Sequence, residues 1–364
     1  MLFIESEYTN SLDIGEKRMV SALNELLPPE YPFDRETLVR KTLNIETNPE
    51  WGCDPRKRPI PDLLRFGVII LDKPPNMTSH EVAAWVSKIL EVEPVGHGGT
   101  LDPKVTGVLP LALGKATPLG HLWLKSDKEY ICVMKLHGDV PEEEILRVFR
   151  EFTGEIYQRP PLRSAVKRRT RRRKIYELEF LEKDGRDVLF RVKCQAGTYI
   201  RKLCVDIGDV LGVGAHMIDL RRIRSGVFEE KYAVIMQQVV DAYLLWKETE
   251  DGSELRNVVL PMEVGTLHLK RIIVSDKAVG AITYGAQLYA PGVVAFDYNI
   301  VAGDTVALLT IKGELIGLAT VDVSGDDLAV MNRGQVTKKI RVLMPRDVYP
   351  PFWKGEFKKP SMHV

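Results

Sequence analysis

The sequence predicts an α/β (α+β) protein with a small, mostly β domain near its C-terminal end. Apolar runs of strand length alternate with helical patterns between residues 66 and 210. The pattern then changes, because residues 305–323 form two apolar runs around Lys312-Gly313, which indicates a hairpin. Between these regions the acidic stretch at residues 248–254 predicts a domain boundary near 250–268.

Composition excludes several classes of protein. The chain of 364 residues is long enough for about two or three domains with separate cores. Its four cysteines show no Cys-x-x-Cys spacing, so neither a zinc site nor a disulfide framework is indicated. The first residues lack a signal-peptide pattern, and no stretch approaches the roughly 18 apolar residues of a membrane span. We therefore expect a cytoplasmic protein that does not contact a membrane.

The N-terminal region carries the weaker structural signals. Residues 11–27 have helical spacing that ends at Pro28-Pro29. Residues 51–61 are rich in proline and charge, which predicts an extended connector.

The stronger signals begin with an expected strand at residues 66–71. A helix should follow from Thr78, because Thr78 and Glu81 have the spacing of a capping box and apolar residues then repeat at helical intervals as far as Ile89. Further along, the sequence predicts strands at 108–113, 129–136, 175–181 and 188–194, helices at 141–152 and 197–210, and a loop at 158–174.

A glycine-rich segment, Gly96 to Gly107, contains a single carboxylate, Asp102. Glycine permits tight turns and close approach of a ligand, and Pro103 biases Asp102 away from a helical conformation. The apolar run at 108–113 follows directly. The segment therefore predicts a sharp loop that holds one carboxylate at the end of a buried strand. An Asp-Pro pair on its own is more typical of a structural turn, because both are turn residues, and only the rest of the chain favours a functional carboxylate.

Positive charge gathers in one place although the net charge is only +1. The run from Arg163 to Lys174 holds eight cations and no acid. Such a block is either a solvated face or a nucleic-acid contact, and its density favours the second, because neutralising phosphates releases counterions. Because Pro160-Pro161 precede it, we expect a mobile loop that closes on the nucleic acid.

Five short motifs follow one another across residues 66–228. They are Lys73-Pro74 with Thr78-Ser79, Gly96-His97-Gly98-Gly99-Thr100-Leu101-Asp102, Lys128-Glu129-Tyr130, Gly197-Thr198-Tyr199-Ile200-Arg201, and Leu220-Arg221-Arg222 with Gly226. In sequence and in order they resemble the motifs of the TruB-type pseudouridine synthases. The stretch from Gln158 to Lys167 and the following arginines look like those of dyskerin and its archaeal counterparts. The C-terminal portion is similar to a PUA domain, and the chain ends soon after Trp353, as in the shorter archaeal form.

The resemblance covers about residues 35–353 and implies a domain plan. A mixed-sheet catalytic domain is expected at 51–265 and an RNA-binding PUA domain at 266–350, with a tail at 351–364. Residues 1–50 would be an extension that packs on the PUA domain. Asn76 departs from the family pattern, because many relatives have Gly there.

The resemblance also implies the site. Asp102 would be the catalytic carboxylate in a dry pocket, Arg201 its ion-pair partner, and Tyr130 the aromatic wall against a flipped uridine. Lys73, His97 and Leu220 would support the site or contact RNA, although a solvated Lys, a loop-bracing His and a core Leu are the ordinary alternatives. The proposed RNA contacts in the basic run are Arg163, Lys167, Arg168, Arg169, Arg171 and Arg172.

The implied function is isomerisation of uridine to pseudouridine, without metal or cofactor. One hypothesis is guide-dependent action on rRNA, with H/ACA guide RNA and the other H/ACA core proteins as partners. A second is stand-alone action on the tRNA T-loop. A third is an RNA-binding scaffold without activity, against which the intact set Asp102, Tyr130 and Arg201 argues.

Overall fold

The computed structural model describes residues 22–42, 45–159 and 169–352, and these form two compact units. One unit combines the residues up to Gly67 with those from Val259 onward, and the other spans Val68–Val258. The second unit therefore ends within the interval predicted for a boundary, whereas residues 51–67 group with the first unit. The predicted helix at 11–27 lies mostly outside the described residues, of which 22–26 are helical.

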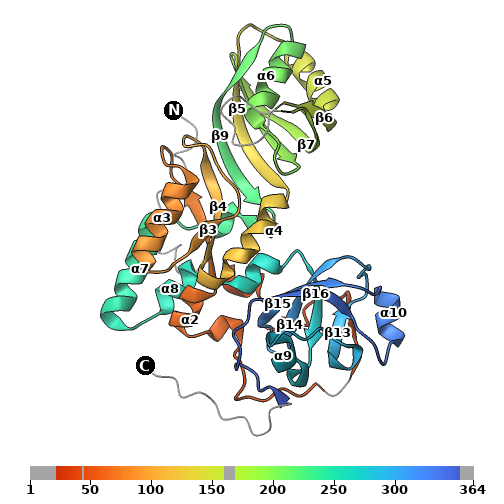
Figure 1. Ribbon diagram of the computed structural model, residues 1–364. Helices are drawn as coiled ribbons and strands as arrows, with labels where there is room; N and C mark the ends of the chain where they lie inside the picture. Colours follow the sequence, from red (N-terminus) through yellow and green to blue (C-terminus); the bar gives the residue numbers. More distant parts are fainter. Residues whose placement is uncertain (1–21, 43–44, 160–168, 353–364) are drawn as a thin grey trace. The chain divides into compact units, whose positions relative to one another are not determined.

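A mixed sheet forms the second unit (Figure 1). Strands β4 and β9 pair in parallel and their neighbours pair antiparallel. The strand order is β2 (Gly67–Lys73), β4 (Thr106–Leu113), β9 (Ala215–Ser225), β5 (Lys128–Leu136), β8 (Asp187–Cys194), β7 (Arg171–Asp184) and β6 (Gly154–Gln158), with β3 (Val95–His97) beside β4 and β10 (Phe228–Glu229) beside β9.

Several helices of this unit bury one apolar face in its core. The predicted capping box is present at the start of α3, where Thr78 and Glu81 bond reciprocally. Helix α5 buries Ile145, Val148 and Phe149 and keeps its acidic residues in the first turn. The helices of the unit are α3 (Ser79–Leu90), α4 (Gly120–Lys125), α5 (Glu142–Phe152), α6 (Ile200–Val210), α7 (Met236–Thr249) and α8 (Ser253–Val258), with short 3-10 turns η2 (Gly114–Leu119) and η3 (Glu230–Tyr232).

The first unit contains a second sheet, built mainly from the C-terminal part of the chain. The predicted hairpin is present, because β14 and β15 pair antiparallel around Lys312-Gly313. The sheet order is β1 (Leu38–Arg40), β13 (Val293–Asp297), β12 (Lys270–Val274), β14 (Thr305–Thr310), β15 (Leu315–Val321) and β16 (Thr337–Val342). The other elements of the first unit are α2 (Ile60–Arg65), α9 (Asp276–Thr283), α10 (Gly325–Val330), β11 (Leu260–Pro261), η1 (Pro55–Lys57), η4 (Met262–Thr266) and η5 (Ala290–Gly292).

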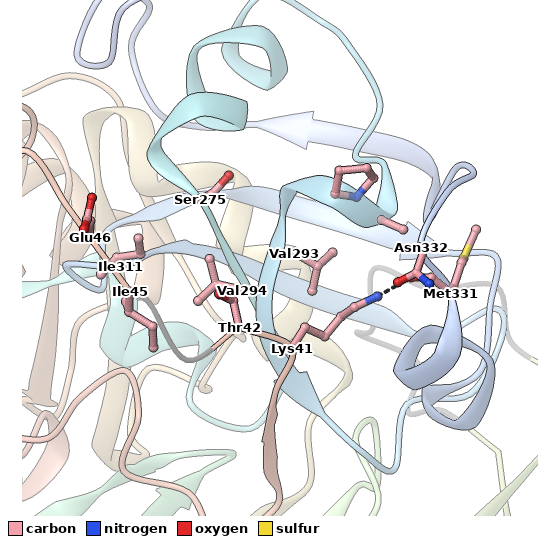
Figure 2. Close-up of a pocket in the computed structure, with 12 residues that line it drawn as sticks. Lys41, Thr42, Ile45, Glu46, Ser275, Val293, Val294, Ile311, Met331 and Asn332 are labelled. Carbon is pink, nitrogen blue, oxygen red and sulfur yellow. Dashed lines mark hydrogen bonds between the residues drawn. The ribbon is translucent and has the colours of Figure 1, made fainter.

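The N-terminal segment belongs to this second sheet. Strand β1 pairs with β13, and Arg35 forms an ion pair with Asp297 at 2.9 Å. Figure 2 shows Lys41 reaching across a hollow of the same unit toward Met331, whose carbonyl accepts a hydrogen bond from the Lys41 ammonium. The ammonium also donates to the Leu328 carbonyl at 2.8 Å, and burial lowers the pKa of Lys41. Lys41 therefore fastens the N-terminal segment to the end of α10.

Two predictions about local structure are wrong. Residues 171–174 of the basic run are not loop, because β7 begins at Arg171 and pairs with β6. A charged run can form a strand here because exposed and partly buried residues alternate along β7. One face of the strand lies in solvent, and the other packs against the protein. Residues 51–61 are not fully extended either, since they include η1 and the start of α2, which begins after Pro59.

Candidate active site

The loop between β3 and β4 presents Asp102 to solvent. Leu101 and Val105, on either side, are buried in the core of the second unit, at 4% and 3% exposed. The Leu101 amide donates to the Ser79 hydroxyl at 2.9 Å, and the Val105 amide donates to the Asp102 carbonyl at 3.0 Å. The loop is thus anchored at both ends, and the carboxylate projects from a fixed backbone.

The guanidinium of Arg201 donates to the Asp102 carboxylate. Arg201 is the second residue of α6, and its neighbour Ile200 is buried in the core that also holds Leu101. The side chains of Asp102 and Arg201 are 55% and 51% exposed. The described residues therefore bring the pair together, but they do not enclose it in a dry pocket.

Lys73 is fully buried, which differs from the solvated alternative. Its ammonium donates to the carbonyls of Pro74 and Met77 at 2.7 Å and of Pro103 at 3.0 Å. Burial lowers the pKa of Lys73. The residue fastens the loop after β2 to the residue that follows Asp102, so its direct contacts are structural.

Tyr130 and Leu220 lie in the same core and are each 8% exposed. Burial raises the pKa of Tyr130, and the positive charge of Arg222 opposes that rise. These positions place a phenol and an aliphatic side chain in the core that supports the Asp102 loop. Their contact with a nucleotide stays a prediction.

His97 is half-buried in β3. Its ring meets that of His80 edge to face, with the centroids 4.7 Å apart, and its buried Nδ1 has no hydrogen-bond partner among the described residues. Burial lowers the pKa of His97, and His80 and Arg222 lower it further. The ring therefore braces the start of the loop, and an RNA contact stays a prediction.

Half of the predicted RNA contacts in the basic run, Arg163, Lys167 and Arg168, lie outside the described residues. Arg169 is exposed. Arg171 and Arg172 open strand β7, and Arg172 forms an ion pair with Glu155 at 3.2 Å in which both side chains are more than half exposed. This pair is screened by solvent and leaves the Arg172 guanidinium accessible.

Sequence reasoning did not single out three buried polar residues around the site, namely Lys128, Gln158 and Arg222. Lys128 and Arg222 are 5% and 1% exposed, and Gln158 is 2% exposed. The Gln158 amide donates to the Tyr199 carbonyl at 3.1 Å and accepts from the Tyr199 amide at 2.9 Å, which fixes the residue that caps α6. Lys128 and Arg222 stand inside recognised motifs, and that was the only signal for them.

Four known domain families match successive parts of the chain, and two of these matches include Asp102 and Arg201 of the candidate site. Residues 87–200 match the TruB family pseudouridylate synthase N-terminal domain, and residues 201–265 match the tRNA pseudouridylate synthase B C-terminal domain. Residues 270–343 match a PUA domain and residues 31–83 a DKCLD (NUC011) domain.

Individual relatives cover most of the chain. Proteins named "Probable tRNA pseudouridine synthase B" from Methanocaldococcus jannaschii and Methanopyrus kandleri are each 54% identical, over 88% of this chain and 95% of their own. A solved Cbf5-Nop10-Gar1 complex contains a chain that is 52% identical with a TM-score of 0.81, covering 86% of this chain and 95% of that one. A structure of an H/ACA RNP bound to a substrate RNA containing 2'-deoxyuridine gives 48% identity and a TM-score of 0.82, covering 87% and 97%.

Fold, site and relatives together define the class: this is a pseudouridine synthase, an isomerase that acts on RNA. The chain belongs to the TruB family and carries a PUA domain. No helix in the described part of the chain is long and apolar enough to cross a membrane.

Proposed function

We propose that this chain isomerises uridine in rRNA under the direction of an H/ACA guide RNA and also modifies the T-loop of tRNA. The observation that carries the proposal is the ion pair of Asp102 and Arg201, within the segments that match the TruB family. The likeness to chains from H/ACA complexes supports guide-dependent action. The names of the relatives support a tRNA substrate.

In the proposed reaction the bond between N1 of uracil and C1′ of ribose breaks, and a bond between C5 and C1′ forms. C5 loses a proton and N1 gains one, so the change is an isomerisation that consumes no redox equivalent. Asp102 would be the carboxylate that initiates the reaction, and Arg201 would keep it ionised and oriented. Tyr130 would stack on the flipped base, and Leu220 would form the opposite wall.

Because the Asp102–Arg201 pair is half-exposed, the dry environment would be completed by the bound RNA. Excluding water would strengthen the attraction between carboxylate and guanidinium and hold the carboxylate at one orientation. Lys73 and His97 would act through the loop on which Asp102 stands.

The proposal also assigns partners and segments. The partners would be guide RNA, rRNA, tRNA and the other H/ACA core proteins, including those named Nop10 and Gar1 in the solved complexes. Residues 51–265 would supply catalysis and 266–350 would anchor RNA, with 1–50 attached to the latter. The location would be cytoplasmic.

Release of tritium from RNA labelled at C5 of uridine tests this function. Turnover of an rRNA fragment only with guide RNA and partner proteins would establish guide dependence, and turnover of tRNA by the chain alone would establish stand-alone action. Binding without turnover under both conditions would identify a scaffold and contradict the proposal. A chelator should leave turnover unchanged.

A further inference from the structure

Arg222 lies at the junction of three elements of the second unit. It is 1% exposed and stands on β9. Its Nε donates to the Val108 carbonyl on β4 at 2.7 Å, and its Nη2 donates to the Gly99 carbonyl at 3.2 Å. One side chain therefore joins β9 to β4 and to the loop that carries Asp102.

The same guanidinium reaches Tyr130. Tyr130 and Arg222 are register partners on the antiparallel strands β5 and β9, so their side chains leave the sheet on the same face. Burial raises the pKa of Tyr130 and the positive charge of the Arg222 guanidinium lowers it, in keeping with two side chains that lie on the same face of neighbouring strands. One rigid, planar group therefore binds the Gly99 carbonyl and lies on the same face of the sheet as the Tyr130 phenol.

The backbone around Arg222 leaves little room for movement. Gly107 pairs with Arg222, and a Cβ at Gly107 would come within 2.2 Å of the Arg222 carbonyl oxygen. Gly107 also has φ +98°, which favours glycine. The close approach of β4 and β9 fixes the point from which the guanidinium extends.

A second buried cation, Lys128, approaches the same loop. A Cβ at Gly99 would lie 3.6 Å from Arg222 Nη1 and 3.8 Å from Lys128 Cε. The Lys128 ammonium donates to the carbonyls of Trp123 at 2.7 Å and Ser126 at 2.6 Å. Within the part of the chain that the structure describes, the side-chain hydrogen bonds of both cations go to neutral oxygens. Two buried cations with neutral partners reduce stability, and such arrangements are concentrated at functional sites.

We propose that Arg222 is a positioning residue for pseudouridine formation, whose guanidinium fixes the Tyr130 hydroxyl relative to the Asp102 loop. This inference rests on the proposed function. Arg222 is too buried to contact RNA itself, so it acts through Tyr130 and Gly99. Lysine at this position would keep the charge but lose the planar group that binds the Val108 and Gly99 carbonyls at once beside Tyr130.

A double-mutant cycle tests the inference, using the chain with whichever RNA and partner proteins support wild-type turnover. The variants are Arg222→Lys, Tyr130→Phe and the double variant, compared by single-turnover rate constant, RNA affinity and thermal unfolding. Arg224→Lys is the matched control, because Arg224 is on the same strand but is partly exposed and pairs with Glu129 at 2.9 Å. We expect Arg222→Lys to lower the rate constant about 10- to 100-fold, as loss of a charged hydrogen bond would, with RNA affinity within threefold of wild type.

The cycle separates positioning from general support of the fold. If Arg222 acts through the Tyr130 hydroxyl, the double variant should be only about twofold slower than Tyr130→Phe, since the hydroxyl is already absent. The inference would be overturned if the rate losses of the two single variants multiplied in the double variant, or if Arg222→Lys kept the wild-type rate constant. In either case, turnover by the wild-type chain would still support the proposed function. A wild-type chain without turnover would overturn both.

Discussion

Arg201 on α6 donates a hydrogen bond to Asp102, 99 positions earlier in the chain, although both side chains are about half exposed. An exposed ion pair contributes little to folding, about 0–1 kcal/mol. What fixes the pair is the buried residue beside each member, Leu101 for Asp102 and Ile200 for Arg201, because both belong to one core cluster. The fold therefore fixes the positions of the Asp102 and Arg201 side chains, although their ion pair adds little to folding stability. This is typical of a catalytic site.

Asp102→Asn should abolish pseudouridine formation while leaving the fold intact. The amide keeps the size of the side chain but removes its charge and its nucleophilic oxygen. We expect RNA affinity within a few-fold of wild type and a change in unfolding free energy below about 1 kcal/mol. Asp206→Asn, which removes another carboxylate paired on α6, is the control. Turnover of the Asp102 variant at a tenth of the wild-type rate or more, a loss of only about 1.4 kcal/mol, would contradict the catalytic role.

Gln158→Ala should lower both stability and turnover. The substitution leaves the amide and carbonyl of Tyr199 without their side-chain partner, at a cost of about 1–3 kcal/mol. Because Tyr199 caps α6, we expect Arg201 to lose its fixed position and turnover to fall by more than RNA affinity. Chemical denaturation and single-turnover assays measure the two effects. Gln237→Ala, at an exposed amide on α7, should change neither; equal results for the two variants would refute the role of Gln158.

Local sequence patterns predicted those helices and strands whose formation depends on residues close together in the sequence. The capping box of α3 and the apolar face of α5 are examples, since their signals lie within a few residues. Strand β9 was not predicted, because charged residues interrupt its alternation and its partners β4 and β5 lie far away in sequence. Helix α7 was also not predicted, since its apolar residues are not confined to one face.

The residues of the candidate site also divide into those that the sequence predicted and those that only the folded structure reveals. The pairing of Asp102 with Arg201 was foreseen from family motifs and not from spacing, because no local rule brings α6 to that loop. The burial of Lys73 and Arg222 was not foreseen, since a cation is normally exposed. Their burial depends on carbonyls that distant loops supply, Pro103 for Lys73 and Gly99 for Arg222, and only the assembled fold brings these together.

The basic run should bind RNA phosphates. Replacing Arg168, Arg169, Arg171 and Arg172 by alanine should weaken RNA binding and make the slope of log affinity against log salt shallower by up to about 0.7–0.9 per lost contact. Replacing Arg147 and Arg186 is the control, because these exposed arginines are paired with acids elsewhere in the unit. An unchanged slope in the basic-run variant would make this segment a solvated face.

The C-terminal β domain should anchor RNA through exposed cations on and beside its edge strand β16. Truncation near residue 265 is a poor test, because it would remove β13 from β1. We expect alanine at Arg333, Lys338, Lys339 and Arg341 to weaken guide-RNA binding, with little loss of stability since all four are exposed. Electrophoretic mobility shifts with guide RNA measure the effect, and Lys277→Ala on α9 is the control. Wild-type affinity in the quadruple variant would exclude this surface.

Lys128 should make stability depend on pH. Burial, followed by the nearby Arg222, lowers the pKa of Lys128 to about 8 from 10.5. Between these values the unfolded chain keeps a proton that the folded chain has lost, so stability should rise with pH across this window, by up to about 3 kcal/mol. Below pH 8 the buried charge reduces stability in full, and above 10.5 it no longer does. Chemical denaturation at several pH values measures the free energy of unfolding of the wild type and of Lys128→Met, and the difference between the two isolates the contribution of Lys128. Lys135→Met, which removes an exposed lysine from the same strand, is the control. The Met variant should lack the rise between pH 8 and 10.5; parallel pH profiles for wild type and Lys128→Met would show that the folded state does not depress this pKa.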